Sequence, residues 1–239
     1  MKIISAHQGV LRALCSLEAG RADQAGFRTG LSVWDALLPT GGMVHGAVHE
    51  LLSDPQANSP LMAAALLTRA AIREGGAVVW SDPVWRSEGM LCPTALSDLG
   101  IPLERLIVLR PKDATQERWA IAECLRCKGV SITVAAVSRL SRVQARQFQL
   151  AAERGGGMGL LLRKVGKESA CYAAATRWLV SPAPGDQATQ RWKLELVHGH
   201  GGQVGQGVFL EVDRESGHVR AFPVVEHSAA QAQEARLRA

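Results

Sequence analysis

Long apolar runs are missing from this 239-residue chain. A membrane-spanning helix needs roughly 18 or more consecutive apolar residues, and no such stretch occurs. The longest candidate, residues 61–72, is too short and is interrupted by Thr68 and Arg69. The first residues also lack a hydrophobic stretch followed by a small-residue cleavage site, so we expect neither a membrane anchor nor a signal peptide.

Cysteine is scarce, odd in number and scattered along the chain: Cys15, Cys92, Cys124, Cys127 and Cys171. A secreted disulfide scaffold would carry a denser and usually even set. The cysteine content therefore indicates a protein of the reducing cytoplasm.

Metal-ligand spacing is nearly absent as well. Cys124 and Cys127 form a C-x-x-C pair, but no second pair or regularly spaced histidines follow, and the pair falls inside a predicted helix. Ordinary helix cysteines are therefore favoured over a zinc site. His198 and His200 precede two glycines, which favours a hairpin over a metal-binding turn. We expect no metal and no cofactor.

The net charge is +5, from 27 Lys and Arg against 22 Asp and Glu. An excess of arginine suggests an acidic partner, either nucleic acid or an acidic protein face. A charge of this size is also common on proteins that bind neither, so it favours DNA binding only weakly.

Short apolar stretches alternate with longer helical patterns through the first two thirds of the chain. The strand-like stretches are 47–52, 77–81, 106–109, 130–137 and 159–162, and the helical ones are 61–73, 87–99, 114–128 and 142–154. This alternation is typical of an α/β protein in which helices cover both faces of a mainly parallel sheet.

The pattern changes after residue 170, where three strand-like stretches follow with few helices between them: 173–180, 191–198 and 207–212. We interpret them as an antiparallel extension of the sheet. Residues 1–25 have apolar side chains at helical spacing and are predicted to form a helical N-terminal arm. The core domain is expected at 26–225, and residues 226–239, which have almost no apolar anchor, form a flexible C-terminal tail.

A motif at Thr29–Leu52 carries a family resemblance. It comprises a short capped helix, a Pro-Thr-Gly-Gly break and a strand, and it resembles the approach to the phosphate loop of RecA-like recombinases. Residues 99–111 and 179–185, together with the Arg- and Gln-rich stretch 139–159, resemble the ImuA family within that superfamily. The resemblance covers about residues 27–213 and implies a three-layer RecA-like core.

The phosphate loop itself departs from the RecA-like pattern. Such a loop needs glycines, a lysine for the β- and γ-phosphates and a hydroxyl for Mg²⁺. After Ser53 the chain instead places Asn58, Ser59 and Pro60 at the matching positions. The stretch 130–137 ends without the carboxylate that would hold Mg²⁺, and Asp82 is better explained as a strand-ending residue than as a catalytic acid. We therefore predict that the core domain lacks functional Walker motifs and that it does not hydrolyse ATP.

Several exposed-looking side chains remain as contact candidates. The connection at 163–170 is short for a DNA-binding loop, but Arg163, Lys164 and Lys167 could contact phosphates. Trp85 and Arg86 follow a predicted strand, where they could form a contact hot spot or pack under their loop.

Three arginines, Arg139, Arg142 and Arg146, belong to a stretch that also carries several glutamines. They could form a basic surface for DNA or for an acidic partner, or simply a solvated helix face. The residues alone leave these alternatives open.

The ImuA resemblance implies a non-catalytic accessory protein of SOS-inducible, error-prone translesion DNA synthesis. Its implied partners are an ImuB-like homologue of Y-family polymerases, an error-prone C-family DNA polymerase, and RecA. Two alternatives from other classes are a divergent nucleotide-binding RecA-like ATPase and a SulA-like inhibitor of cell division. Nucleotide affinity would identify the first, and binding to the tubulin-like division protein would identify the second.

Overall fold

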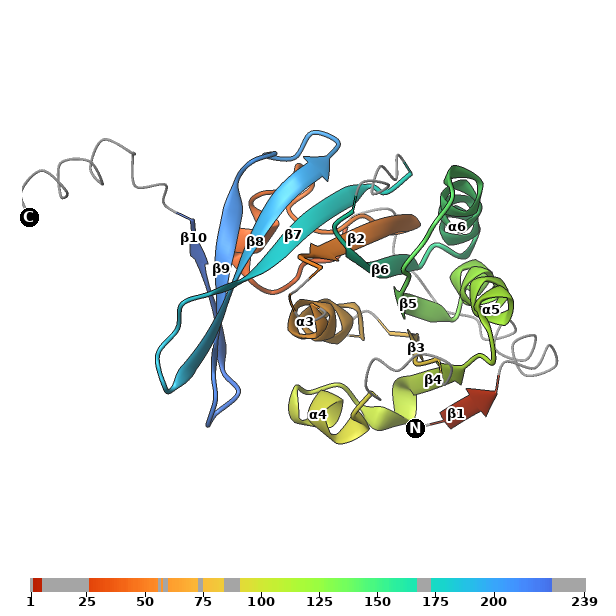
Figure 1. The fold of residues 1–239 in the computed structure, drawn as a ribbon, viewed down its shortest axis with the longest axis horizontal. Coiled ribbons are helices and arrows are strands. Elements are labelled where there is room, and N and C mark those ends of the chain that lie inside the picture. The colour runs from red at the N-terminus through yellow and green to blue at the C-terminus, as the bar shows by residue number, and fades with distance from the viewer. Residues whose placement is uncertain are drawn as a thin grey trace, which may run out of the picture.

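The structure is a computed structural model, and it describes most of the chain (Figure 1). The described residues are 2–5, 26–55, 57, 60–72, 75–83, 91–166 and 173–224. For residues 2–5 the description covers the backbone. Among the described helices, none is long and apolar enough to cross a membrane.

Strands and helices alternate along the chain. In order they are β1 (Lys2–Ser5), α2 (Ser32–Asp35), β2 (Ala47–Ser53), α3 (Leu61–Ile72), β3 (Ala77–Ser81), α4 (Pro93–Asp98), η1 (Leu103–Arg105), β4 (Leu106–Arg110), α5 (Ala114–Arg126), β5 (Val130–Ala136), α6 (Arg142–Gly155), β6 (Met158–Lys164), β7 (Thr176–Ala183), β8 (Thr189–Gly199), β9 (Gly207–Asp213) and β10 (Val219–Pro223).

All the strands join one sheet in the order β1-β4-β3-β5-β6-β2-β7-β8-β9-β10. Neighbours from β1 to β7 pair in parallel, whereas β7 to β10 pair antiparallel. Strand β7 therefore belongs to both halves, with β2 on one side and β8 on the other. The predicted fold class, a mainly parallel α/β core with an antiparallel C-terminal extension, is confirmed.

Helices cover both faces of the parallel half, which gives the three layers (Figure 1). The largest apolar cluster lies under α2, α3 and α4 and includes Trp34, Leu67 and Leu96. Trp34 and Trp178 meet edge to face there, with ring centroids 5.6 Å apart. A second cluster packs α5 and α6 against β2, β5 and β6. Strands buried on both faces explain the continuous apolar runs seen in the sequence.

Local capping fixes both helices of that second layer. Asp113 accepts hydrogen bonds from the backbone of Thr115 and Gln116 at the start of α5. At the start of α6, Ser141 and Gln144 form a reciprocal capping box. Helix α6 ends at Gly156, whose φ of 70° is the left-handed conformation that glycine adopts without steric cost. These caps define where α5 and α6 begin and where α6 ends, and apolar packing then holds the two helices together.

Two parts of the N- and C-terminal segments differ from the sequence-based expectation. Residues 2–5 of the predicted helical arm form strand β1, which pairs in parallel with β4 at the sheet edge, so a helix is wrong for those residues. Isoleucines at positions 3 and 4 favour a strand through their β-branched side chains. Strand β10 was not anticipated, and the predicted tail, 226–239, lies outside the described residues.

Candidate functional site

The connection from β2 to α3 occupies the place of a phosphate loop. Ser53 ends β2 and is buried, and its hydroxyl has no hydrogen-bond partner among the described residues. Pro60 stands directly before α3, and its carbonyl accepts the hydrogen bond of Ala64 N–H at 3.1 Å. The other two predicted loop positions, Asn58 and Ser59, lie outside the described residues. The frame of strand, loop and helix is therefore present.

A positive charge at this loop comes from the neighbouring strand. Lys164 ends β6, and its ammonium donates a hydrogen bond to the carbonyl of Ala57. Lys164, which was predicted to contact phosphates, is thus exposed, and its side chain binds the loop backbone. Residues 54–60 contribute neither lysine nor glycine. The loop consequently lacks the groups with which a phosphate loop holds the β- and γ-phosphates.

The acidic side chains at the carboxyl edge of the sheet bind protein groups. Strand β5 ends at Ala136 without a carboxylate. Asp82, just after β3, accepts a hydrogen bond from Arg110 at 3.0 Å and one from the backbone N–H of Leu91 at 3.3 Å. Glu117 is buried and accepts from Ser81 at 3.2 Å. Asp82 follows β3 directly, and its pair with Arg110 ties the ends of β3 and β4 together.

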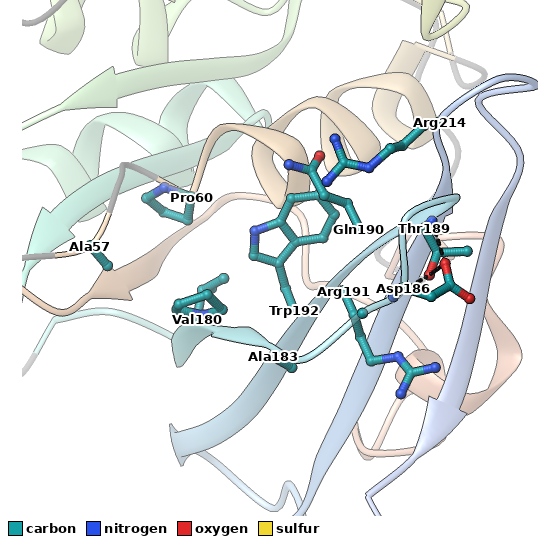
Figure 2. A pocket seen from close by; sticks show the side chains of 12 residues that line it. Ala57, Pro60, Val180, Ala183, Asp186, Thr189, Gln190, Arg191, Trp192 and Arg214 are labelled. Carbon is teal, nitrogen blue, oxygen red and sulfur yellow. Dashed lines mark hydrogen bonds between the residues drawn. The ribbon is translucent and has the colours of Figure 1, made fainter.

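A pocket of about 440 Å³ opens beside this edge, between the start of α3, the end of β7 and the turns of the antiparallel strands (Figure 2). Figure 2 shows the Trp192 indole inside it, with Gln190 and Arg214 on one side. Asp186 is committed to its own turn, where Oδ1 accepts from Ala188 N–H, Thr189 N–H and the Thr189 hydroxyl. Trp192, Gln190 and Arg214 are therefore the side chains that the pocket offers to a ligand.

Glu50 lies at the centre of a buried ion cluster that the sequence analysis missed. It sits in the middle of β2, fully buried, and its two oxygens accept from Arg163 at 2.9 Å and Arg177 at 2.8 Å. The cluster thus joins β6, β2 and β7. An acidic residue inside a fully buried central strand is the signal that could have revealed it, because a buried carboxylate requires charged partners.

Arg163 therefore does not contact phosphates from the surface. Its side chain is only 5% exposed, and its guanidinium is directed at Glu50. The sequence-based expectation for this residue is wrong, because the strand continues through position 163 and is buried on both faces up to that residue.

His49, next to Glu50, belongs to a neutral polar chain on the opposite side of β2. Its Nε2 lies 3.0 Å from the carbonyl of Val44, and its Nδ1 lies 2.7 Å from the Thr176 hydroxyl. A carbonyl only accepts, so Nε2 carries the proton and Nδ1 accepts from Thr176. Thr176 accepts in turn from the Trp178 indole at 3.1 Å. Burial lowers the pKa of His49 to about 4, so the ring is neutral.

The three predicted surface arginines are all exposed: Arg139 precedes α6, Arg142 begins it and Arg146 lies in its second turn. Arg146 pairs with Glu153 at 3.8 Å. Arg142 and Arg146 thus lie on α6 and Arg139 shortly before it, whereas Lys164 is at the end of β6. Trp85, Arg86 and Lys167 lie outside the described residues.

The C-x-x-C pair occupies the apolar interior. Cys124 and Cys127 are buried in a cluster with residues of β3, β4 and β5. Within the described part of the chain, no group of three or more His, Cys, Asp or Glu side chains is placed to hold a metal ion.

Two curated proteins show clear similarity to the chain. Both are named Protein ImuA, from Caulobacter vibrioides strain NA1000 / CB15N and from strain ATCC 19089 / CIP 103742 / CB 15. Each is 32% identical over 205 residues, which covers 77% of this chain and 82% of the relative. No protein-family model matches the chain.

Proposed function

Because the chain belongs to the ImuA family, we propose that it is a non-catalytic accessory protein of SOS-inducible, error-prone translesion DNA synthesis in the cytoplasm. Family membership implies the accessory role in SOS mutagenesis. The absence of catalysis is our own inference from the β2–α3 connection, which keeps the frame of a phosphate loop and contains neither lysine nor glycine in residues 54–60.

The chemistry of ATP hydrolysis supports this inference. Phosphoryl transfer depends almost entirely on positioning and on cations that stabilise the developing charge. Here β5 ends without a carboxylate for Mg²⁺, and the carboxylates of Asp82 and Glu117 accept hydrogen bonds from protein groups. A protein whose sheet edge lacks these groups acts by binding its partners rather than by hydrolysing ATP.

The partners that we propose are an ImuB-like homologue of Y-family polymerases, an error-prone C-family DNA polymerase and RecA. The exposed arginines Arg139, Arg142 and Arg146 offer a surface for such contacts. Lys164 is a further candidate at the loop, and Trp85, Arg86 and Lys167 stay predictions of the sequence.

Two measurements test the proposal. Calorimetric titration with ATP and Mg²⁺ should give no saturable heat, and incubation should release no phosphate, whereas a RecA-type ATPase run in parallel should give both. Tagged protein should retain the ImuB-like partner from damage-treated cells, and the triple change of Arg139, Arg142 and Arg146 to Glu should reduce that capture. If neither the ImuB-like protein nor RecA associates with the wild-type chain, the accessory role is wrong.

The pocket beside Pro60 favours one second candidate, a divergent nucleotide-binding protein. Trp192 and Arg214 could offer a ring to stack on a base and a cation for a phosphate. That candidate requires saturable heat with ATP that is lost in both Trp192→Ala and Arg214→Ala. Heat that persists in these variants, or no heat at all, removes it.

A further inference from the structure

Positive charge is concentrated in one segment of the chain. Residues 112–155 contain eight Lys and Arg against four Asp and Glu, a net charge of +4, while the whole chain carries +5. This segment comprises α5, β5 and α6. Because β5 is buried between its neighbours, the charged side chains gather on the two helices and their ends.

Few of these cations are neutralised on the surface. Arg126 pairs with Glu123, and Arg146 pairs with Glu153 at 3.8 Å. The third acidic residue of these two helices, Glu117, lies on α5 and is buried. Among the described residues, no ion pair is formed by Arg118, Arg139 or Arg154. The surface therefore has positive charge left to attract an acidic ligand.

A groove of about 260 Å³ runs between the two helices, and we name it the α5–α6 groove. Its lining is shared by the two helices: α5 contributes Arg118, Trp119, Ala122, Glu123 and Arg126, and α6 contributes Gln144, Gln147 and Phe148. The α5 members recur at helical spacing and so form one stripe along the helix. The floor is apolar, because Ala122 and Phe148 are buried and Trp119 is half-buried, while the rim is basic and polar.

Aliphatic side chains continue the groove onto the outer face of α6. Val143 is 68% exposed and Leu150 is 39% exposed, and both belong to the same solvent-facing stripe as Arg146 and Gln147. Aliphatic groups alternating with arginines on a helix surface leave apolar area in water unless a ligand covers them.

We propose that the α5–α6 groove and the adjoining face of α6 form a docking surface for an acidic amphipathic helix of a partner protein. Apolar side chains of that helix cover the groove floor together with Val143 and Leu150, while its Asp and Glu side chains meet the arginine rim. The inference rests on the proposed function in that the ligand is a protein of the accessory complex.

The chemistry of the surface favours a peptide over nucleic acid. Single-stranded nucleic acid binds through exposed aromatic platforms beside cations. Here the aromatic rings lie in the floor, the exposed apolar groups are aliphatic, and Glu123 and Glu153 stand within the patch, where they repel a phosphate backbone. The carboxylates of a partner helix can be spaced so that none of them lies against Glu123 or Glu153.

A defined probe tests the surface directly. It is an 18-residue fluorescein-labelled peptide of Leu, Glu and Ala with its leucines along one helical face, titrated with the full chain and followed by anisotropy. A scrambled peptide of the same composition and an 18-nucleotide oligothymidine serve as comparison ligands. We expect saturable binding of the amphipathic peptide, weakened at least ~10-fold by Val143→Glu and by Arg146→Glu.

Matched substitutions elsewhere control for the added charge. Val204→Glu repeats the first change at a valine that is 56% exposed, and Arg105→Glu repeats the second at an exposed arginine of η1. Both controls should bind within about twofold of wild type. Circular dichroism of all four variants checks that they are folded.

Other outcomes overturn the inference. They are equal binding of the scrambled peptide, unchanged binding by Val143→Glu, or binding of oligothymidine that the α6 variants abolish while the peptide does not bind. Capture from cells separates this inference from the proposed function. If wild type and Val143→Glu retain the ImuB-like protein equally, the groove is not its docking site and the accessory role stands. If wild type retains no partner, the accessory role fails, and the peptide titration still decides the groove.

Discussion

Arginines inside the sheet and arginines on the α5–α6 face have opposite circumstances. Arg163 and Arg177 share the fully buried carboxylate of Glu50, at 2.9 and 2.8 Å. Arg139 and Arg154 are exposed and form no ion pair with any described residue. The fold supplies the carboxylate that holds the inner pair. Among the described residues it supplies none to the outer pair, which is therefore available to an acidic group of another molecule.

The difference shows that the count of arginines in a sequence says little about function. A buried guanidinium without its carboxylate would be strongly unfavourable, so the inner cluster holds β6, β2 and β7 in one register. Exposed guanidinium groups add little to stability whether or not they are paired. A surface partner can therefore be sought only among the outer set, and substitutions should separate the two sets clearly.

The largest expected effect is at the shared carboxylate. Glu50→Ala leaves two guanidinium groups in the interior without their counter-charge, and removing one partner of a buried ion pair costs about 3–5 kcal/mol. Urea denaturation should show this loss in the free energy of unfolding. The exposed Glu215→Ala, as a control, should change it by less than about 0.5 kcal/mol. Equal midpoints for the two variants would show that the cluster does not stabilise the fold.

His49 extends the comparison between buried and exposed basic residues, because its side chain is buried like the inner arginines but is kept neutral. Its pKa is lowered by burial to about 4 in the fold, below the ordinary value of 6.5. The neutral form is favoured by folding, so its contribution is fully present above pH 6.5 and is lost as the pH falls through about 4. The loss reaches about 3 kcal/mol below pH 4.

Carboxylates titrate in the same range, so the His49 effect is read as a difference. His49→Gln should show a flatter fall in unfolding free energy than wild type between pH 6.5 and 4, whereas the exposed His200→Gln should follow wild type. Parallel curves for wild type and His49→Gln would mean that the ring is not held neutral.

Helices α5 and α6, which carry the outer arginines, approach each other closely at Gly155, so a change there should affect the stability of the fold. A Cβ at Gly155 would come within 2.0 Å of the Leu125 carbonyl, so Gly155→Ala must separate the two helices. Overpacking of this kind costs about 1–3 kcal/mol, and we expect a matching fall in thermal stability. Gly166→Ala adds its methyl to open space and should be nearly neutral. If Gly155→Ala is as stable as wild type, the close approach is not real.

The smallest expected effects belong to the outer arginines. Arg154→Ala should change the free energy of unfolding by less than about 0.5 kcal/mol, because the side chain is exposed and forms no ion pair with a described residue. Arg163→Ala, measured beside it, should cost several times more. Similar losses for the two arginines would erase the distinction between the two sets.

Most of the architecture was predictable from the sequence, because the core strands and helices have strong and separate apolar patterns. The predicted strand at 77–81 coincides with β3, and the helical pattern at 142–154 differs from α6 by one residue. The edges of the sheet were not predictable. Strand β1 is four residues long, and β10 combines Arg220, exposed Phe222 and Pro223 in a pattern without alternation. Short edge strands form through pairing with a neighbour that sequence periodicity does not contain.

At the candidate site, the sequence predicted which groups are missing better than it predicted which side chains contact each other. The missing lysine after Ser53 and the uncharged end of β5 are visible in the sequence itself. The burial of Arg163 was not, because it depends on Glu50, which is 113 positions away in the chain. The groove beside Trp119 was missed for a similar reason, because its lining comes from two helices and depends on how they pack together.

The position of Glu50 also limits how modular this protein can be. Strand β2 pairs with β6 of the parallel core and with β7, which begins the antiparallel extension, and a single carboxylate binds one arginine from each. Removing β7–β10, or grafting another extension in their place, would deprive Glu50 of Arg177 as well as exposing the edge of β2. The two halves of the sheet should therefore be exchanged between homologues as a unit, with residues 50, 163 and 177 transferred together.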